Sequence, residues 1–191
     1  MNSIVDSVMG MLSSGDNLSA MGKSVGGDEK SVKSALGMGL PLIMGSMADK
    51  ASKPGGAEEL ANMIPKTGSS TPDNLSAQIN NPDTSGGSDM LNKLMGNQMG
   101  PMQSAISKKS GLAPDGVGKL LAMVAPMIMG QVGKMFTQGN MDSKGLSALL
   151  GSQSKMAMQS SPEASDLSKQ LNIGQVGGGG LMAKLKNMFG K

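Results

Sequence analysis

Apolar residues recur at helical spacing in two long stretches of the chain, and no stretch alternates in the way a strand does. In the first stretch the apolar positions follow the spacing i, i+4, i+7, i+8 and i+11, as on one face of a helix: Leu36, Leu40, Ile43, Met44 and Met47. The second stretch repeats this spacing through Val117, Leu121, Val124, Ile128, Val132 and Met135. The pattern predicts an all-α protein.

Residues typical of helix ends flank both stretches. Asp28 precedes Glu29 at the first start, and Pro114 precedes Asp115 at the second. Proline is tolerated in a first turn, and acidic side chains favour the positive end of a helix. Gly and Pro follow at Lys53-Pro54-Gly55-Gly56, and Gly follows at Gln138-Gly139-Asn140. In each copy, the start and the stop therefore bound one central helix.

The two stretches resemble copies of one motif. Residues 32–45 and 117–130 align at a constant offset of 85 and are identical at seven of fourteen positions, including the proline and the Ile-Met-Gly that follows it. Weaker similarity on both sides extends each copy to about 3–64 and 89–151. A duplication explains why both copies share the proline and the Ile-Met-Gly. The alternative is a chance alignment of two amphipathic helices of similar composition.

The repeat divides the chain into five parts. Residues 1–64 and 89–151 are the two helical repeats, joined by a polar linker at 65–88. A flexible Ser/Gly-rich linker follows at 152–180, in which Glu163–Leu171 can form a brief helix, and residues 181–191 form a basic amphipathic helix. We therefore expect two homologous bundles of short helices that pack together, plus a C-terminal helix.

Proline lies inside both apolar stretches, at Pro41 and Pro126. Each proline removes one backbone hydrogen bond and crowds the preceding turn, which predicts a kinked central helix or, alternatively, two short helices that meet at the proline. The expected core of the repeats consists of Leu36, Leu40, Pro41, Ile43 and Met44 in the first copy and of Leu121, Val124, Pro126, Ile128 and Met129 in the second.

The C-terminal segment has an apolar face and a basic face. Its apolar residues are Leu181, Met182, Leu185, Met188 and Phe189, while Lys184, Lys186 and Lys191 point elsewhere. Such a helix can fold back on the protein's own core, dock into a neighbouring subunit, or lie on an anionic membrane surface. We predict that these five apolar residues form the interaction site.

The second copy resembles a known bacterial family. Gly111-Leu112-Ala113-Pro114-Asp115, then Lys119-Leu120-Leu121-Ala122, then Pro126 are similar to the signature of the YidB-like family, also called domain of unknown function 937. The first copy departs from it, with Gly26-Gly27-Asp28-Glu29 at the entry. The resemblance covers about residues 3–151 and implies an all-α bundle of short helices. This family has no established activity.

Composition excludes much enzyme chemistry. The chain has no Cys, His, Trp, Tyr or Arg, so it lacks thiol and imidazole catalysis, disulfides and zinc fingers of the usual kind. It has 21 Met and two aromatic residues, and we interpret methionine as the filler of the core. Groups such as Met95, Met99 and Met102 also suggest Cu(I) binding, but they coincide with the core periodicity.

No catalytic, cofactor or metal site emerges from the remaining residues. A Ser/Lys dyad is conceivable at Ser31 with Lys30 or Lys33 and at Ser107 with Lys108, yet these are only sequence neighbours, and nothing in the pattern buries a lysine. The net charge of +3 is small, and without Arg or an aromatic platform we expect no nucleic-acid partner. No small-molecule substrate is evident.

These observations favour a non-enzymatic structural or self-assembling protein. Glycines at Gly37, Gly39, Gly45 and Gly130 permit close helix packing, so we expect Gly- and Met-rich faces to bind further copies or another protein. A peripheral membrane-surface binder that uses Leu181–Lys191 is the alternative. The first ten residues lack an export signal, and the longest apolar run, 120–129, is shorter than the ~20 residues of a membrane span, so we expect a cytoplasmic protein.

Overall fold

The computed structural model describes residues 3–14, 16–64, 79 and 84–174, and every regular element in this part of the chain is a helix. The helices are α1 (Ile4–Leu12), α2 (Asn17–Val25), α3 (Glu29–Ala51), α4 (Gly56–Met63), α6 (Ser85–Met95), the short 3-10 helix η2 (Gly96–Gln98), α7 (Met99–Ser110), α8 (Pro114–Gln138), α9 (Ser143–Ser160) and α10 (Pro162–Leu171). The prediction of an all-α protein is confirmed.

The ends of the two longest helices follow from local chemistry. Asp28 caps α3 by accepting a hydrogen bond from the backbone N–H of Ser31 at 2.7 Å. Hydrogen bonding by the Ser31 side chain and by this backbone N–H lowers the pKa of the Asp28 carboxyl. Helix α8 begins at Pro114, in the first turn as predicted. Each central element is one continuous helix that contains its proline, Pro41 in α3 and Pro126 in α8.

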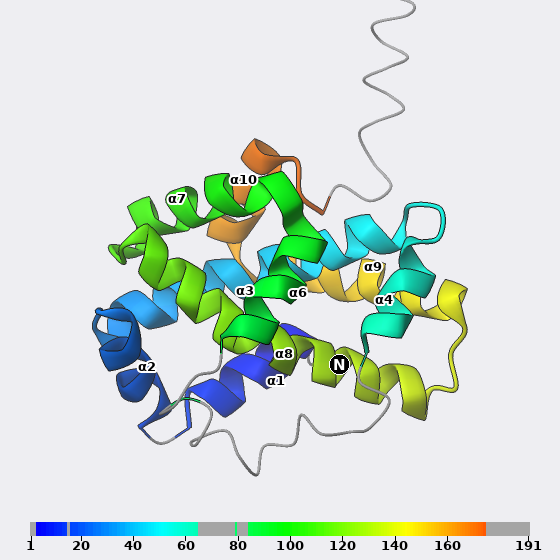
Figure 1. The fold of residues 1–191 in the computed structure, drawn as a ribbon, viewed down its shortest axis with the longest axis horizontal. Helices are drawn as coiled ribbons and strands as arrows, with labels where there is room; N and C mark the ends of the chain where they lie inside the picture. The colour runs from blue at the N-terminus through cyan, green and yellow to red at the C-terminus, as the bar shows by residue number, and fades with distance from the viewer. Residues whose placement is uncertain (1–2, 15, 65–78, 80–83, 175–191) are drawn as a thin grey trace, which may run out of the picture.

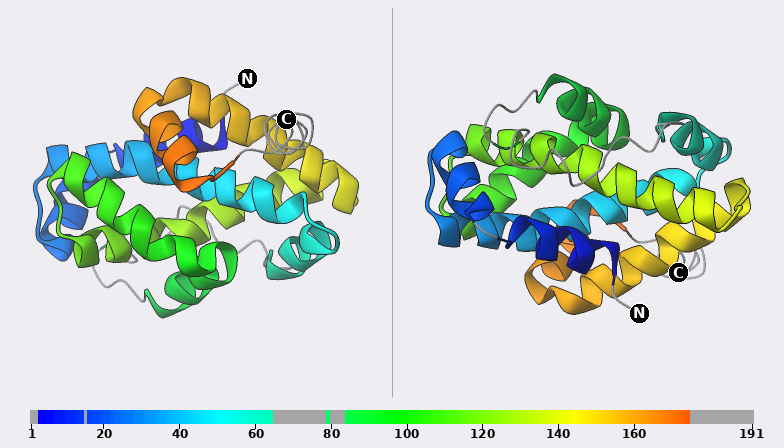
Figure 2. Two further views of the ribbon diagram at one scale, coloured as in Figure 1. Left: turned by 90° about the horizontal axis from the view of Figure 1, so that it is seen from above. Right: turned by 90° about the horizontal axis from the view of Figure 1, so that it is seen from below.

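Helices α3 and α8 pack against each other at the centre of the molecule, and the shorter helices surround them (Figure 1). Figure 2 shows α6 on one side of this pair and α9 with α10 on the opposite side. Helices α7 and α9 from the second half contact α3, while α1 and α2 from the first half contact α8. The two halves of the chain therefore share one continuous buried cluster.

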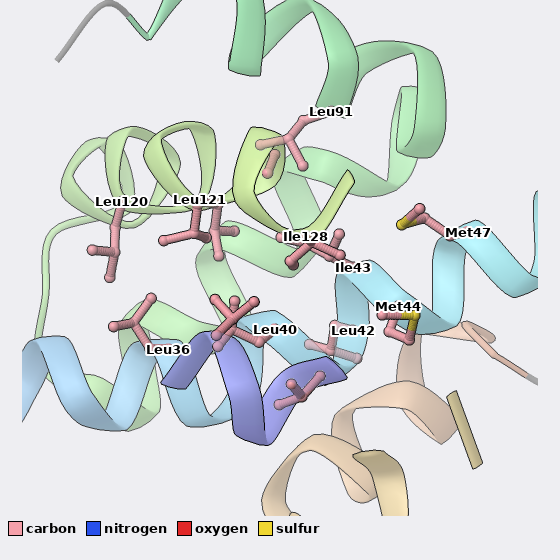
Figure 3. Close-up of a cluster of buried hydrophobic side chains, with 14 of the residues drawn as sticks. Leu36, Leu40, Leu42, Ile43, Met44, Met47, Leu91, Leu120, Leu121 and Ile128 are labelled. Atoms are coloured by element: carbon pink, nitrogen blue, oxygen red, sulfur yellow. The ribbon is translucent and has the colours of Figure 1, made fainter. Parts of the chain in front are cut away.

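Leucine and isoleucine side chains fill the contact between α3 and α8. Leu120 and Leu121 of α8 point toward Leu36 and Leu40 of α3, and Ile128 lies beside Ile43 (Figure 3). All six side chains are inaccessible to solvent. Leu36 and Leu121, like Ile43 and Ile128, lie 85 residues apart in the sequence, and all four side chains are buried in this contact.

Methionine supplies a large share of the interior. Of the 18 methionines that the structure describes, eight are buried and ten are half-buried, and none of these 18 is exposed. The buried ones are Met21, Met38, Met44, Met47, Met95, Met102, Met123 and Met129. A flexible, unbranched thioether fits irregular gaps between helices, and in this chain it stands where Leu and aromatic residues normally pack.

The prediction of a flexible linker at 152–180 is wrong over residues 152–162, ahead of the brief helix that was expected. Helix α9 continues to Ser160, and α10 follows, as the brief helix expected at Glu163–Leu171. The buried residues of the second half of α9 are Gln153, Ser154 and Ala157, and Gln153 accepts a 2.8 Å hydrogen bond from the backbone N–H of Ile4. Small and polar residues form this packed face, so hydrophobic periodicity does not reveal it. Residues 175–180 lie outside the described part.

The polar linker predicted at 65–88 ends earlier than expected. Helix α6 begins at Ser85, and Gly87 in its first turn is buried. A small buried residue provides no apolar signal in the sequence, which explains the misplaced boundary. Ile79 is buried in the hydrophobic cluster, while residues 65–78 and 80–83 lie outside the described part.

Helix α8 corrects the expectation that no segment is long and apolar enough to span a membrane. Among the described residues, α8 is the one helix that meets this criterion, and it does so by length and composition alone. The uninterrupted apolar run covers only residues 120–129, whereas the helix extends over 25 residues. More than half of its apolar window is buried by other helices, which accounts for its apolar character as a core helix.

Two adjacent glycines in α6 test how closely this helix approaches α8. A Cβ atom at Gly87 would overlap the carbonyl oxygen of Ala122, while a Cβ at Gly86 meets nothing within 4 Å. We expect Gly87→Ala to lower the free energy of unfolding by about 1–3 kcal/mol, because backbone atoms cannot yield cheaply. Gly86→Ala, the matched control, should be neutral or stabilise by up to about 1 kcal/mol. Urea unfolding measures both; equal effects of the two variants would contradict the close approach.

Candidate functional site

A polar groove of about 570 Å³ lies at the C-terminal end of α3. Its walls come from α3, α4, α6, η2 and the end of α10, which the fold brings together from both halves of the chain. We call it the α3-end groove and define it by the polar residues Asp49, Lys50, Lys53, Glu59, Asn92, Gln98 and Asn172. Helices α3, α6 and α10 end beside it and α4 begins there, so backbone carbonyls and N–H groups of helix ends both lie near the groove.

Lys50 joins three helices at the floor of the groove. Its Nζ atom lies 2.7 Å from Oε1 of Glu59 in α4 and donates a hydrogen bond to the carbonyl oxygen of Lys93 in α6 at 3.2 Å. The Lys50 side chain is 17% exposed, whereas that of Glu59 is 57% exposed. An ammonium group suits the last turns of α3 and α6 because it compensates their carbonyl ends. Lys50 is therefore held in place by structural contacts.

Asp49 joins α3 to the segment that follows α10. Its Oδ2 atom accepts a hydrogen bond from the backbone N–H of Gly174 at 2.6 Å. Burial raises the pKa of the Asp49 carboxyl, while the Gly174 hydrogen bond and the charge of Lys53 partly oppose that rise. The half-buried carboxylate thus holds the residues that follow α10 against α3.

Carboxamide side chains line the rest of the groove. Gln98 donates a hydrogen bond from Nε2 to the carbonyl oxygen of Leu171 at 3.3 Å, linking η2 to the end of α10. Asn172 ends α10 in a left-handed conformation with φ of 53°. Carboxamides donate and accept hydrogen bonds, and the charged residues of the groove are of both signs, so the surface suits polar groups without a strong net charge.

The Ser/Lys pairs considered from sequence do not lie in this groove. The Ser107 hydroxyl donates to the carbonyl oxygen of Leu112 at 2.6 Å, and Lys108 beside it is exposed. Lys30 and Lys33, the neighbours of Ser31, are also exposed. A desolvated lysine is what a Ser/Lys dyad requires, and these three lysines are solvated. Within the described chain, no three acidic side chains gather as a metal site would need.

The structure places the sequence-predicted residues in two groups. The C-terminal residues Leu181, Met182, Leu185, Met188 and Phe189 lie outside the described part. Of the expected core residues, Leu36, Leu40, Pro41, Ile43, Met44, Leu121, Val124, Ile128 and Met129 are buried, and Pro126 is half-buried. None of these core residues lines the groove.

Sequence reasoning missed the groove residues. Glu58 and Glu59 look like a solvated helix start, and Asp49 and Lys50 look like the polar end of an apolar helix. The available signal was the pair Asp49-Lys50 within the last turn of α3, next to buried positions such as Ala48 and Ala51. The partners Lys93 and Gly174 are distant in sequence, so no local pattern indicates them.

Replacing Asp49 by Asn tests the effect of burial on this carboxylate. The folded-state pKa is raised, so the folded protein binds the proton more tightly than the unfolded chain, and the contribution of Asp49 to stability increases as pH falls through its folded pKa. Asn keeps an oxygen for Gly174 without the buried charge. We expect Asp49→Asn to be more stable than wild type at neutral pH, with the difference shrinking in acid. Unfolding curves at both pH values, with exposed Glu58→Gln as control, measure this; a destabilised Asp49→Asn at neutral pH contradicts it.

Two neighbouring lysines test the role of the ammonium group. Lys50→Ala removes the contacts to Glu59 and Lys93, and we expect a loss of about 1–2 kcal/mol in the free energy of unfolding, reduced at high salt. Lys53, in the same groove, is exposed, so Lys53→Ala should change stability by less than about 0.5 kcal/mol. Thermal or urea unfolding of both variants compares them. Equal losses would show that Lys50 does not join the three helices.

Comparisons with known proteins connect this fold to one family. Searches of the curated proteins and of the solved structures found no match. Residues 6–135, more than half of the chain, match the bacterial proteins of unknown function DUF937, in agreement with the resemblance seen in the second copy. The matched region begins in α1 and ends in α8, so it includes both central helices. This chain therefore belongs to the DUF937 family of bacterial proteins, whose function is unknown.

Proposed function

We propose that this protein is a non-enzymatic helical scaffold that assembles with copies of itself or with another protein through its C-terminal segment, Leu181–Lys191. The observation that carries the proposal is the amphipathic pattern of this segment, which follows four consecutive glycines, Gly177–Gly180. An apolar helix on a flexible tether reaches a neighbouring molecule at high effective concentration once a first contact exists. The cytoplasm is the proposed location, and no cofactor or small-molecule substrate is part of the proposal.

The scaffold is proposed to be a tandem duplication of two homologous helical bundles. Its support is the register of α3 and α8, in which the prolines Pro41 and Pro126 and the buried pairs around them differ by the same 85 residues. We include in the proposal that each proline bends its helix, because it removes one backbone hydrogen bond.

Two glycines of α3 are occupied by packing within the chain. A Cβ at Gly39 would overlap Cδ2 of Leu121, and a Cβ at Gly45 would lie 3.3 Å from Cα of Gly174. Both glycines thus serve packing within the chain, so their faces are not free for a second copy. Half-buried methionines such as Met63 and Met141 retain exposed surface that can adapt to a partner helix.

A membrane-surface role is the second candidate. Lys184, Lys186 and Lys191 on the same segment favour anionic lipid, at ~1 kcal/mol for each lysine near the surface. One short helix binds a membrane only marginally, so this role needs anionic lipid and low salt.

Two double variants distinguish assembly from membrane binding. Leu185→Ser with Phe189→Ser removes the apolar face, and Lys184→Ser with Lys186→Ser removes charge but keeps that face. For a self-assembling scaffold we expect light scattering to show oligomers for the full chain and the lysine variant, but monomers for the apolar-face variant and for a chain that ends at Gly180. For membrane binding, flotation with anionic vesicles should fail for the lysine variant.

The same measurements can refute both roles. A full chain that stays monomeric over a wide concentration range, captures no protein partner and does not float with anionic vesicles would overturn the proposal. Circular dichroism of each variant confirms that the helical body is unchanged, so that a loss of assembly is not a loss of folding.

A further inference from the structure

Oxidation chemistry on this protein is confined to methionine. The chain has no Cys, Trp, Tyr or His, so its 21 thioethers are the side chains that peroxides oxidise readily. Burial divides them: eight of the described methionines are buried, and ten are half-buried and thus reachable by a small oxidant. The consequence of oxidation then depends on what each half-buried thioether holds together.

Met158 lies between three segments of the chain. It belongs to α9, and a Cβ built at Gly45 of α3 would lie 3.0 Å from its Cε atom. A Cβ built at Gly174, after α10, would lie 3.5 Å from the same methyl group. The Met158 side chain is half-buried. Its methyl group therefore covers the place where the backbones of Gly45 and Gly174 approach each other.

Neighbouring contacts make this junction sensitive to polarity. Ile173 is fully buried, and its Cγ2 atom would lie 3.1 Å from a Cβ at Gly45. The Asp49 carboxylate holds the Gly174 N–H on the same side of α3. The junction thus combines close apolar contacts with the Asp49 hydrogen bond, and the Ser154 hydroxyl oxygen would lie 3.4 Å from a Cβ at Gly174. A new polar group placed among the apolar contacts needs a hydrogen-bond partner or water.

We propose that Met158 is an oxidation site whose conversion to the sulfoxide releases the end of α10 from α3. A hydroperoxide transfers one oxygen atom to the thioether sulfur: the O–O bond breaks, an S–O bond forms, the sulfur loses two electrons, and the peroxide leaves as water or an alcohol. The sulfoxide is polar and requires solvation, which opens the contact of Ile173 and Gly174 with Gly45. Sulfoxide reduction by a thiol-dependent reductase restores the thioether and the contact.

Peptide mass spectrometry and hydrogen exchange of the full chain test this proposal. After graded hydrogen peroxide treatment we expect the sulfoxide at Met158 to form before those at buried methionines such as Met44 and Met102. In the same samples, amide protection over Ser161–Gly174 should fall by about tenfold or more, while that of the centre of α8 is unchanged.

Matched variants separate the effect of Met158 from general damage. Met158→Leu preserves apolar volume without a thioether, so its α10 protection should survive the same treatment. Met156→Leu, which removes another half-buried methionine of α9, should respond as wild type does. The proposal is overturned if amide protection over Ser161–Gly174 persists when Met158 is fully oxidised. It is also overturned if Met158→Leu loses as much of this protection as wild type does under the same treatment. These readouts do not depend on whether the C-terminal segment assembles or binds membrane.

Discussion

The contact between α3 and α8 is the interaction on which the rest of the structure depends. Both helices are apolar around much of their circumference, and neither can bury its side chains alone. Leu36 and Leu40 meet Leu120 and Leu121. Each of the shorter α-helices in the described part contacts α3, α8 or both, and so covers surface that would otherwise face water. The first and second halves of the chain are therefore interdependent, because helices of each half cover the central helix of the other.

Methionine and glycine have complementary roles in this core. Glycine lets backbones approach where a Cβ would collide, as Gly87 does against Ala122. Methionine then fills the irregular spaces that remain, since its unbranched side chain adapts to many shapes. The same choice limits the oxidation chemistry of the protein to thioethers, and the packing determines which of these thioethers is structurally important.

Polar side chains determine how the outer helices attach. Lys50 connects the ends of α3 and α6 to α4, Asp49 holds the chain after α10, and Gln153 accepts the first N–H of α1. Among the described residues, every buried side-chain nitrogen and oxygen has a hydrogen-bond partner. These ties add directional constraints to a core whose apolar contacts are not directional.

The sequence by itself determined the helical class, the ends of α3 and α8, and the buried face of each, because spacing, caps and proline act within a few residues along the chain. It did not reveal that α9 continues through Gln153 and Ser154, since small and polar residues are buried there only because neighbouring helices lie close and offer hydrogen bonds. The α3-end groove likewise depends on partners separated by up to 125 residues, such as Asp49 and Gly174. Only the tertiary structure decided these features, because contacts between distant segments leave no periodic signal in the chain.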